Sequence, residues 1–82
     1  MRVSFSDTEK RILELWYISK VYGGHWGDNF FAIPEEEILI NKIKNNDEVE
    51  IDSIYKRILK YWSEESNDTP EEEELRKKIE NL

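Results

Sequence analysis

Three features of the 82-residue sequence predict one small domain that is all-α or nearly all-α. Apolar residues recur at helical spacing in several separate segments, and residues typical of a helix start precede these segments. Three Trp, four Tyr and three Phe supply core volume, while the absence of Cys excludes a disulfide framework and a thiolate metal site. The fold must therefore be held by packing alone.

The first helix is expected after a short extended piece. Val3 and Phe5 alternate with polar residues, and Ser6 and Glu9 then form a capping box, in which each side chain binds a free main-chain amide. Gly23-Gly24 ends this helix, because glycine tolerates left-handed backbone geometry. The apolar arc is wide, so we expect packing on more than one side. It contains Ile12, Leu13, Leu15, Trp16, Ile18, Val21 and Tyr22.

A turn-rich loop and a second helix follow. Residues 25–29 contain a Trp among turn formers, and the apolar residues 30–33 could form a short strand. Whether residues 29–33 pair with residues 2–5 as a ribbon stays open. Pro34 suits the first position of a helix whose positive end favours the glutamates that come next. This helix is expected to bury Ile38, Leu39 and Ile43 and to end near Asn45-Asn46.

The third helix has the clearest pattern. Its cap is either within residues 47–50 or at Asp52. Its apolar positions follow the i, i+3, i+4, i+7 spacing and predict one core face. They are Ile51, Ile54, Tyr55, Ile58, Leu59 and Trp62. The opposite face carries Ser53, Lys56, Arg57 and Lys60.

A polar linker, residues 63–68, leads to a fourth helix capped by Thr69. Its favourable i, i+4 charge pairs are Glu72/Arg76, Glu73/Lys77 and Glu74/Lys78. Its narrow apolar stripe is Leu75, Ile79 and Leu82. That stripe could dock on the body, pair with another chain or meet a partner. We divide the chain into a helix-turn-helix-like domain, residues 1–65, and an acidic C-terminal helix, residues 66–82.

The negative charge is concentrated near the C-terminus. The formal net charge is −7, but residues 1–62 carry nine Lys/Arg and eleven Asp/Glu, whereas residues 63–82 carry three and eight. A nearly neutral body does not repel nucleic acid as a uniformly acidic protein would. No uninterrupted apolar run approaches the roughly eighteen residues of a membrane span, and the start lacks the apolar stretch of a signal peptide. We expect a cytoplasmic protein without a membrane partner.

The order of elements resembles the winged-helix group of helix-turn-helix domains. The resemblance covers roughly residues 6–62: a broad first helix, an extended Phe-Ala-Ile, a helix beginning Pro-Glu-Glu-Glu-Ile-Leu, and a third helix, Ile-Tyr-Lys-Arg-Ile-Leu-Lys-Tyr-Trp. It implies that the polar face of the third helix enters the DNA major groove. No wing hairpin follows Trp62, and no Gly marks the turn between helices two and three. The resemblance therefore implies an adapted, wingless version that binds proteins.

No set of residues predicts catalysis or a cofactor. His25 and Asp28 are close in sequence, but one His without a second nitrogen or thiol donor makes a poor transition-metal site. Most carboxylates lie at helix starts or in charge ladders, where capping explains them. Neither a nucleophile motif nor a phosphate-binding Gly-rich loop is present. We expect no enzyme activity, no metal and no cofactor.

The predicted function is that of a small accessory or adaptor protein. We expect it to bind another protein, within DNA or RNA machinery such as replication or transcription, and nucleic acid either directly or through that partner. The candidate partner-binding residues are His25, Trp26, Lys56, Arg57, Lys60 and Tyr61. One alternative is a DNA-binding transcription regulator that forms a homodimer through the C-terminal helix. A second is an acidic inhibitor of a nucleic-acid-binding enzyme.

Overall fold

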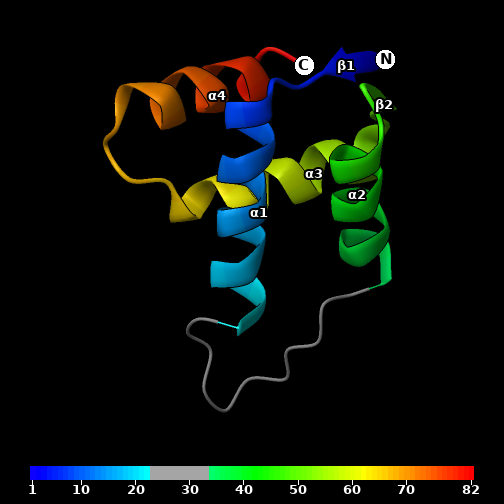
Figure 1. Ribbon diagram of the computed structural model, residues 1–82, viewed down its shortest axis with the longest axis horizontal. Helices are drawn as coiled ribbons and strands as arrows, with labels where there is room; N and C mark the ends of the chain where they lie inside the picture. The colour runs from blue at the N-terminus through cyan, green and yellow to red at the C-terminus, as the bar shows by residue number, and fades with distance from the viewer. Residues whose placement is uncertain (23–33) are drawn as a thin grey trace.

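The computed structural model describes residues 1–22 and 34–82, which are mostly helical with a small two-stranded ribbon (Figure 1). The elements are β1 (Arg2–Ser4), α1 (Asp7–Tyr22), α2 (Pro34–Asn45), β2 (Glu48–Glu50), α3 (Ser53–Trp62), a short 3₁₀-helix (Ser63–Glu65) and α4 (Pro70–Glu80). The nearly all-α prediction is therefore confirmed. The expected helix end at Gly23-Gly24, the His25-Trp26 loop and the apolar residues 30–33 lie outside the described residues.

The ribbon joins the start of the chain to the segment before α3. β1 and β2 are antiparallel, with Val3 opposite Val49, and both valines are buried. Their neighbours along each strand are exposed, as expected for a ribbon with one face on the core. Residues 48–50 are therefore a strand, and the alternative that places the cap of the third helix within residues 47–50 is wrong.

Side chains cap the helices as the sequence indicates. The Ser6 amide donates to Glu9 Oε1 at 2.8 Å and the Glu9 amide donates to Ser6 Oγ at 3.1 Å, which confirms the capping box. Asp52 caps α3 by accepting a hydrogen bond from the Tyr55 amide at 2.8 Å. Thr69 accepts a hydrogen bond from a main-chain amide in the first turn of α4. Each cap satisfies an amide that has no partner within its own helix.

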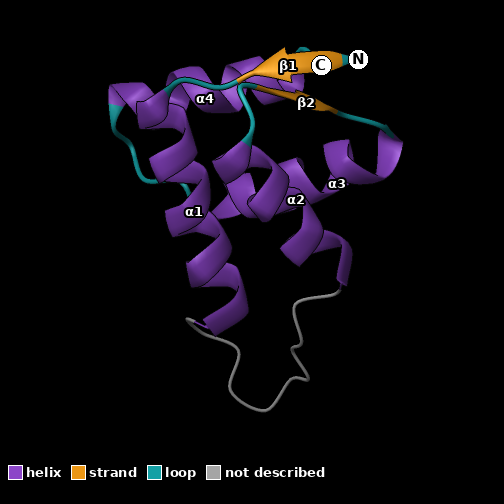
Figure 2. Ribbon diagram, turned by 45° about the vertical axis from the view of Figure 1, so that its right-hand side comes forward, coloured by secondary structure: helices purple, strands orange, loops and turns teal. Residues whose placement is uncertain are grey.

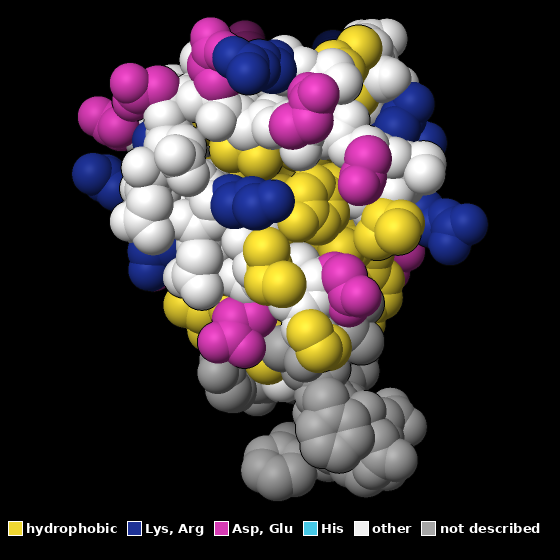
Figure 3. Space-filling model, turned by 90° about the vertical axis from the view of Figure 1, so that its right-hand side faces the viewer, with side chains coloured by type: hydrophobic (Ala, Val, Ile, Leu, Met, Phe, Trp, Pro, Cys, Tyr) yellow, Lys and Arg dark blue, Asp and Glu magenta, His cyan; other side chains and the backbone are white. Residues whose placement is uncertain are grey.

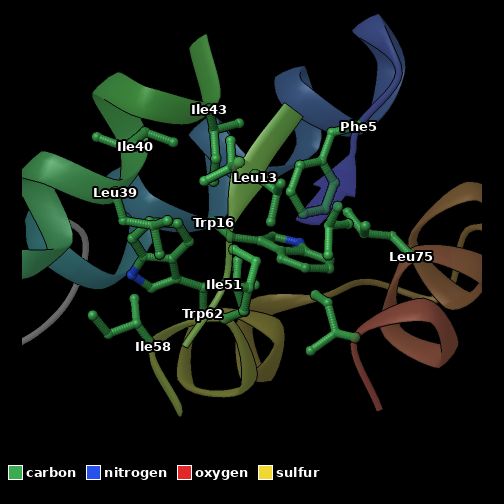
Figure 4. Packing of buried hydrophobic residues seen from close by; sticks show 14 residues of the cluster. Phe5, Leu13, Trp16, Leu39, Ile40, Ile43, Ile51, Ile58, Trp62 and Leu75 are labelled. Carbon is green, nitrogen blue, oxygen red and sulfur yellow. The ribbon is translucent and has the colours of Figure 1, made fainter. Parts of the chain in front are cut away.

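The core contains two buried tryptophans and buried residues from each of the four described α-helices. Trp16 and Trp62 are almost completely enclosed (Figure 4). The other buried hydrophobic residues are Val3, Phe5, Leu13, Leu39, Ile40, Ile43, Val49, Ile51, Ile58, Leu59, Leu75 and Ile79. Since Leu75 and Ile79 belong to α4, the apolar stripe of this helix packs on α1 and α3 of the same chain. Removal of α4 would therefore uncover the core.

α4 lies across the end of the molecule that also holds the ribbon and the beginning of α1 (Figure 2). Lys78 of α4 donates hydrogen bonds to the Ser4 main-chain oxygen at 2.6 Å and to Glu9 at 3.0 Å. In α4, which is described over its whole length, Glu73–Lys77 is the one ion pair that forms among the three expected i, i+4 pairs. The other charged side chains of those three pairs either form hydrogen bonds with residues outside their pair or are exposed.

Both buried tryptophans donate their indole N–H to a buried carboxylate. Trp16 Nε1 lies 2.9 Å from Glu72 Oε1, and Trp62 Nε1 lies 3.1 Å from Glu36 Oε1. Each glutamate is the third residue of a helix that begins with proline. A negative charge at a helix N-terminus is stabilised by the free amides of the first turn, which lowers the cost of burying these carboxylates. The sequence analysis placed both glutamates at helix starts, as observed, but did not predict their burial or their tryptophan partners.

Four residues expected in the core lie at the surface. The exposed fractions are 61% for Leu15, 42% for Ile18, 47% for Ile38 and 52% for Ile54. The described elements leave these four side chains uncovered. α1 contacts α2, α3, α4 and the 3₁₀-helix, in agreement with its wide apolar arc, but the expected burial of Leu15 and Ile18 is wrong.

Candidate partner-binding surface

α3 concentrates positive charge in an acidic chain. It carries Lys56, Arg57 and Lys60 and no acidic residue, whereas the whole sequence contains 19 Asp and Glu. Its buried residues are Ile58, Leu59 and Trp62, which fix the inner side of the helix. The remaining positions must point outward or toward its edges, because successive residues of an α-helix are about 100° apart around the axis.

The three cations of α3 have different environments. Lys56 is half-buried, and its Nζ donates a hydrogen bond to the main-chain oxygen of Leu82 at 2.8 Å. It is therefore engaged with the end of the α4 segment. Arg57 and Lys60 are exposed, and neither forms an ion pair with any residue in 1–22 or 34–82. These two charges are available to a partner.

Tyr61 is held at the surface by a buried lysine. Tyr61 is 43% exposed, and Lys20 Nζ lies 4.3 Å from the centroid of its ring. Lys20 is 8% exposed and pairs with Glu64 at 3.0 Å and Glu65 at 3.4 Å. Burial alone would lower the pKa of the Lys20 ammonium, but Glu64, with smaller contributions from Tyr61 and Glu65, raises that pKa above its ordinary value of 10.5. The charged lysine therefore lies against the ring in a cation–π contact.

Two isoleucines that the sequence analysis assigned to the core extend this surface. Ile54 lies at the start of α3 and Ile38 lies on α2. Lys42 of α2 donates to the Tyr55 hydroxyl at 3.2 Å and lies 5.1 Å from the centre of its ring. Ile38 is one turn before Lys42 and Ile54 directly precedes Tyr55, so the isoleucines flank this contact. Figure 3 shows hydrophobic side chains gathered in the middle of this face.

The α3 ridge is defined as Ile54, Arg57, Lys60 and Tyr61. Of the predicted binding residues, the structure places Arg57, Lys60 and Tyr61 together on it, and turns Lys56 toward α4. His25 and Trp26 lie outside the described residues. The sequence carried no signal that separates Ile54 from the core positions, because it shares their helical spacing.

Neither a metal centre nor a membrane span is found in the described part. Residues 1–22 and 34–82 contain no group of three or more His, Cys, Asp or Glu side chains arranged to hold a metal ion. Within the same ranges, no helix is both long and apolar enough to cross a bilayer. No family model, curated protein or solved structure matches this chain. The chemistry of the α3 ridge must therefore be interpreted from its own residues.

Proposed function

We propose that this chain is a non-enzymatic accessory module that binds another protein through the α3 ridge, as a component of DNA or RNA machinery. In this proposal residues 1–65 form an adapted helix-turn-helix-like domain, and α3 occupies the place of a recognition helix. Residues 66–82 form the acidic helix that supports it. The wingless version of that architecture is the one that the sequence resemblance implies.

The composition of the α3 ridge carries the proposal. Ile54 and Tyr61 expose large apolar surfaces directly beside two cations that have no ion-pair partner in the described part of the chain. Protein interfaces are enriched in Tyr and Arg, and those residue types dominate their binding energy. Scattered single apolar residues are ordinary on a protein surface. Here they share one helix ridge with free cations, which favours a binding role.

The surroundings of α3 favour a protein over a DNA duplex as the direct partner. Asp52 caps the beginning of the helix, and Glu64 follows its end. Both are exposed and would face phosphates if α3 entered the major groove. Lys56, which could otherwise contact phosphate, is bound to the Leu82 main chain. Few phosphate contacts remain, and these contacts supply most of the affinity for DNA.

A charge-reversal pair tests the proposal. Arg57→Glu and Arg11→Glu each replace an exposed helical arginine and change the formal net charge from −7 to −9, but Arg11 lies on α1, outside the ridge. Tagged native chain and both variants are expressed in cells of the source organism, and co-purifying proteins are quantified. We expect a partner that is retained by Arg11→Glu and depleted at least tenfold by Arg57→Glu. Equal recovery with both variants would contradict the proposal.

Direct DNA binding is tested separately by fluorescence anisotropy of a labelled duplex at low and physiological salt. The intact chain is required, because α4 supplies Leu75 and Ile79 to the core. We expect no binding that survives physiological salt. Salt-sensitive binding that Arg57→Glu abolishes and Arg11→Glu retains would favour the DNA-binding alternative.

A further inference from the structure

We infer that the partner contacts this surface through an acidic amphipathic helix, which lies along the α3 ridge and places apolar side chains between Ile38 and Ile54. This inference rests on the proposed function and specifies the chemistry of the partner. The partner is then a protein segment whose carboxylates form ion pairs with Arg57 and Lys60.

The apolar part of the contact is narrow and well defined. Ile38 is 47% exposed and Ile54 is 52% exposed, on two helices that the Lys42–Tyr55 contact joins. Figure 3 shows hydrophobic side chains together in the middle of this face, bordered by acidic side chains and by Lys or Arg. A single row of apolar side chains fits this arrangement, and an amphipathic helix presents such a row at i, i+3, i+4 and i+7.

The length of the ridge also fits a helix. Ile54, Arg57 and Tyr61 are at i, i+3 and i+7, so they lie on one side of α3 over about 10 Å, at roughly 1.5 Å per residue. That distance corresponds to two turns of a partner helix. The two tyrosines of this region, Tyr55 and Tyr61, are each held by a lysine ammonium in the free protein, so little side-chain order must be gained on binding.

Charge complementarity selects an acidic occupant and orients it. Arg57 and Lys60 lack ion-pair partners within residues 1–22 and 34–82, and α3 contains no acid. Glu35 and Glu37, in contrast, flank Ile38 at the beginning of α2, and both are exposed. The carboxylates of the partner are therefore expected over Arg57 and Lys60, away from Asp52 and Glu64 at the two ends of α3 and from the beginning of α2. Complementary charges across an interface fix its register and exclude unlike partners.

An unbiased peptide selection tests this chemistry. A phage-displayed library of peptides of about 15 residues, enough for roughly four helical turns, is panned against the folded full-length chain. Enriched peptides are then measured against two ridge variants, Ile54→Ser and Arg57→Glu, and two α1 controls, Ile18→Ser and Arg11→Glu. The controls match the ridge residues in type and are also exposed on a helix.

We expect enriched peptides with net negative charge and helical apolar spacing. Each ridge variant should weaken their binding at least tenfold, whereas the α1 controls should change it less than twofold. Enrichment of basic or unpatterned peptides, equal binding to ridge and control variants, or no enrichment would overturn the inference. The charge-reversal capture described above reports on the proposed function independently. A partner that is lost with Arg57→Glu but binds by a basic or extended segment would refute the helix inference alone.

Discussion

The hydrogen bond between Trp16 and Glu72 should make the stability of the chain depend on one buried carboxylate. Glu72 Oε1 accepts from Trp16 Nε1 at 2.9 Å, and Glu72 Oε2 accepts from the Thr69 hydroxyl at 2.8 Å. We consider Glu72→Gln, which retains the shape of the side chain but removes its charge. Hydrogen bonds to charged groups contribute about 1.5–3 kcal/mol and neutral ones about 0.5–1.5 kcal/mol, so two weakened bonds should lower the free energy of unfolding by about 2–3 kcal/mol.

The neighbouring Glu71→Gln is the matched control. Glu71 lies in the same first turn of α4 and is exposed, so its replacement removes the same charge from the same helix end. Stability is measured by urea denaturation followed by far-UV circular dichroism at neutral pH. Each 1 kcal/mol should also lower Tm by roughly 4–8 °C in a domain of this size. Equal stability of the two variants would refute the reasoning.

The pH dependence supplies a second readout of the same group. Burial alone would raise the pKa of the Glu72 carboxyl, but hydrogen bonds from Trp16, Thr69 and the Asn67 main chain lower that pKa below its ordinary value of 4.5. Because the folded pKa is lowered, this stabilisation is fully present above about pH 4.5 and is lost as the pH falls through the folded value. The native chain and Glu72→Gln should therefore converge in stability in acid. A difference that stays constant down to pH 2 would contradict this assignment.

Three further experiments, two of which compare a buried with an exposed residue, test the packing and the charges. Leu75→Ala should lower the free energy of unfolding by about 2–5 kcal/mol because the Leu75 side chain is fully buried. Leu15→Ala at the surface should change it by less than about 0.5 kcal/mol. Equal losses in urea titrations would contradict the packing of α4 in the core. In thermal melts, Ile58→Ser should lower Tm strongly and Ile54→Ser should leave it nearly unchanged. The reverse order would contradict the assignment of the buried and exposed sides of α3. Lys20→Gln should remove stabilisation that the native chain has in full below about pH 10.5 and loses as the pH rises through the raised folded pKa of Lys20. The two chains should therefore differ in urea titrations near neutral pH and converge in alkali, and a difference that is the same at both would contradict this.

Local signals predicted the elements well, because they depend on neighbours in sequence. The Ser6/Glu9 capping box, Pro34 at the start of α2 and Thr69 at the start of α4 all mark helix starts that the structure contains. Each signal is a contact, or a backbone preference, within one turn. Such preferences do not require knowledge of which elements later meet.

Tertiary partners could not be predicted in the same way. Val49 alternates with two glutamates much as Val3 alternates with polar residues, yet the pairing joins segments more than forty positions apart. Likewise, nothing near Glu36 or Glu72 in sequence indicates that each accepts a hydrogen bond from a tryptophan on another helix. Long-range contacts decide both outcomes, and a single sequence does not encode them as a local pattern.

The candidate surface was predicted in part. Arg57, Lys60 and Tyr61 could be placed on the outer side or edge of the third helix from periodicity alone. Ile54 could not, because an apolar residue at core spacing is assigned to the core unless the covering elements are known. Its exposure depends on where α2 and α4 pack around α3, which is a property of the whole fold.

Site-specific photo-crosslinking tests the central claim, that the α3 ridge contacts a protein partner, most directly. A photoreactive amino acid replaces Ile54 in one chain and Ile18 in another, since both isoleucines are exposed on helices but only Ile54 belongs to the ridge. After irradiation in living cells of the source organism, crosslinked products are quantified with and without protease and nuclease treatment. We predict a discrete, protease-sensitive and nuclease-resistant product from position 54 and none from position 18. Equal products from both positions, or a nuclease-sensitive product from position 54, would contradict the account.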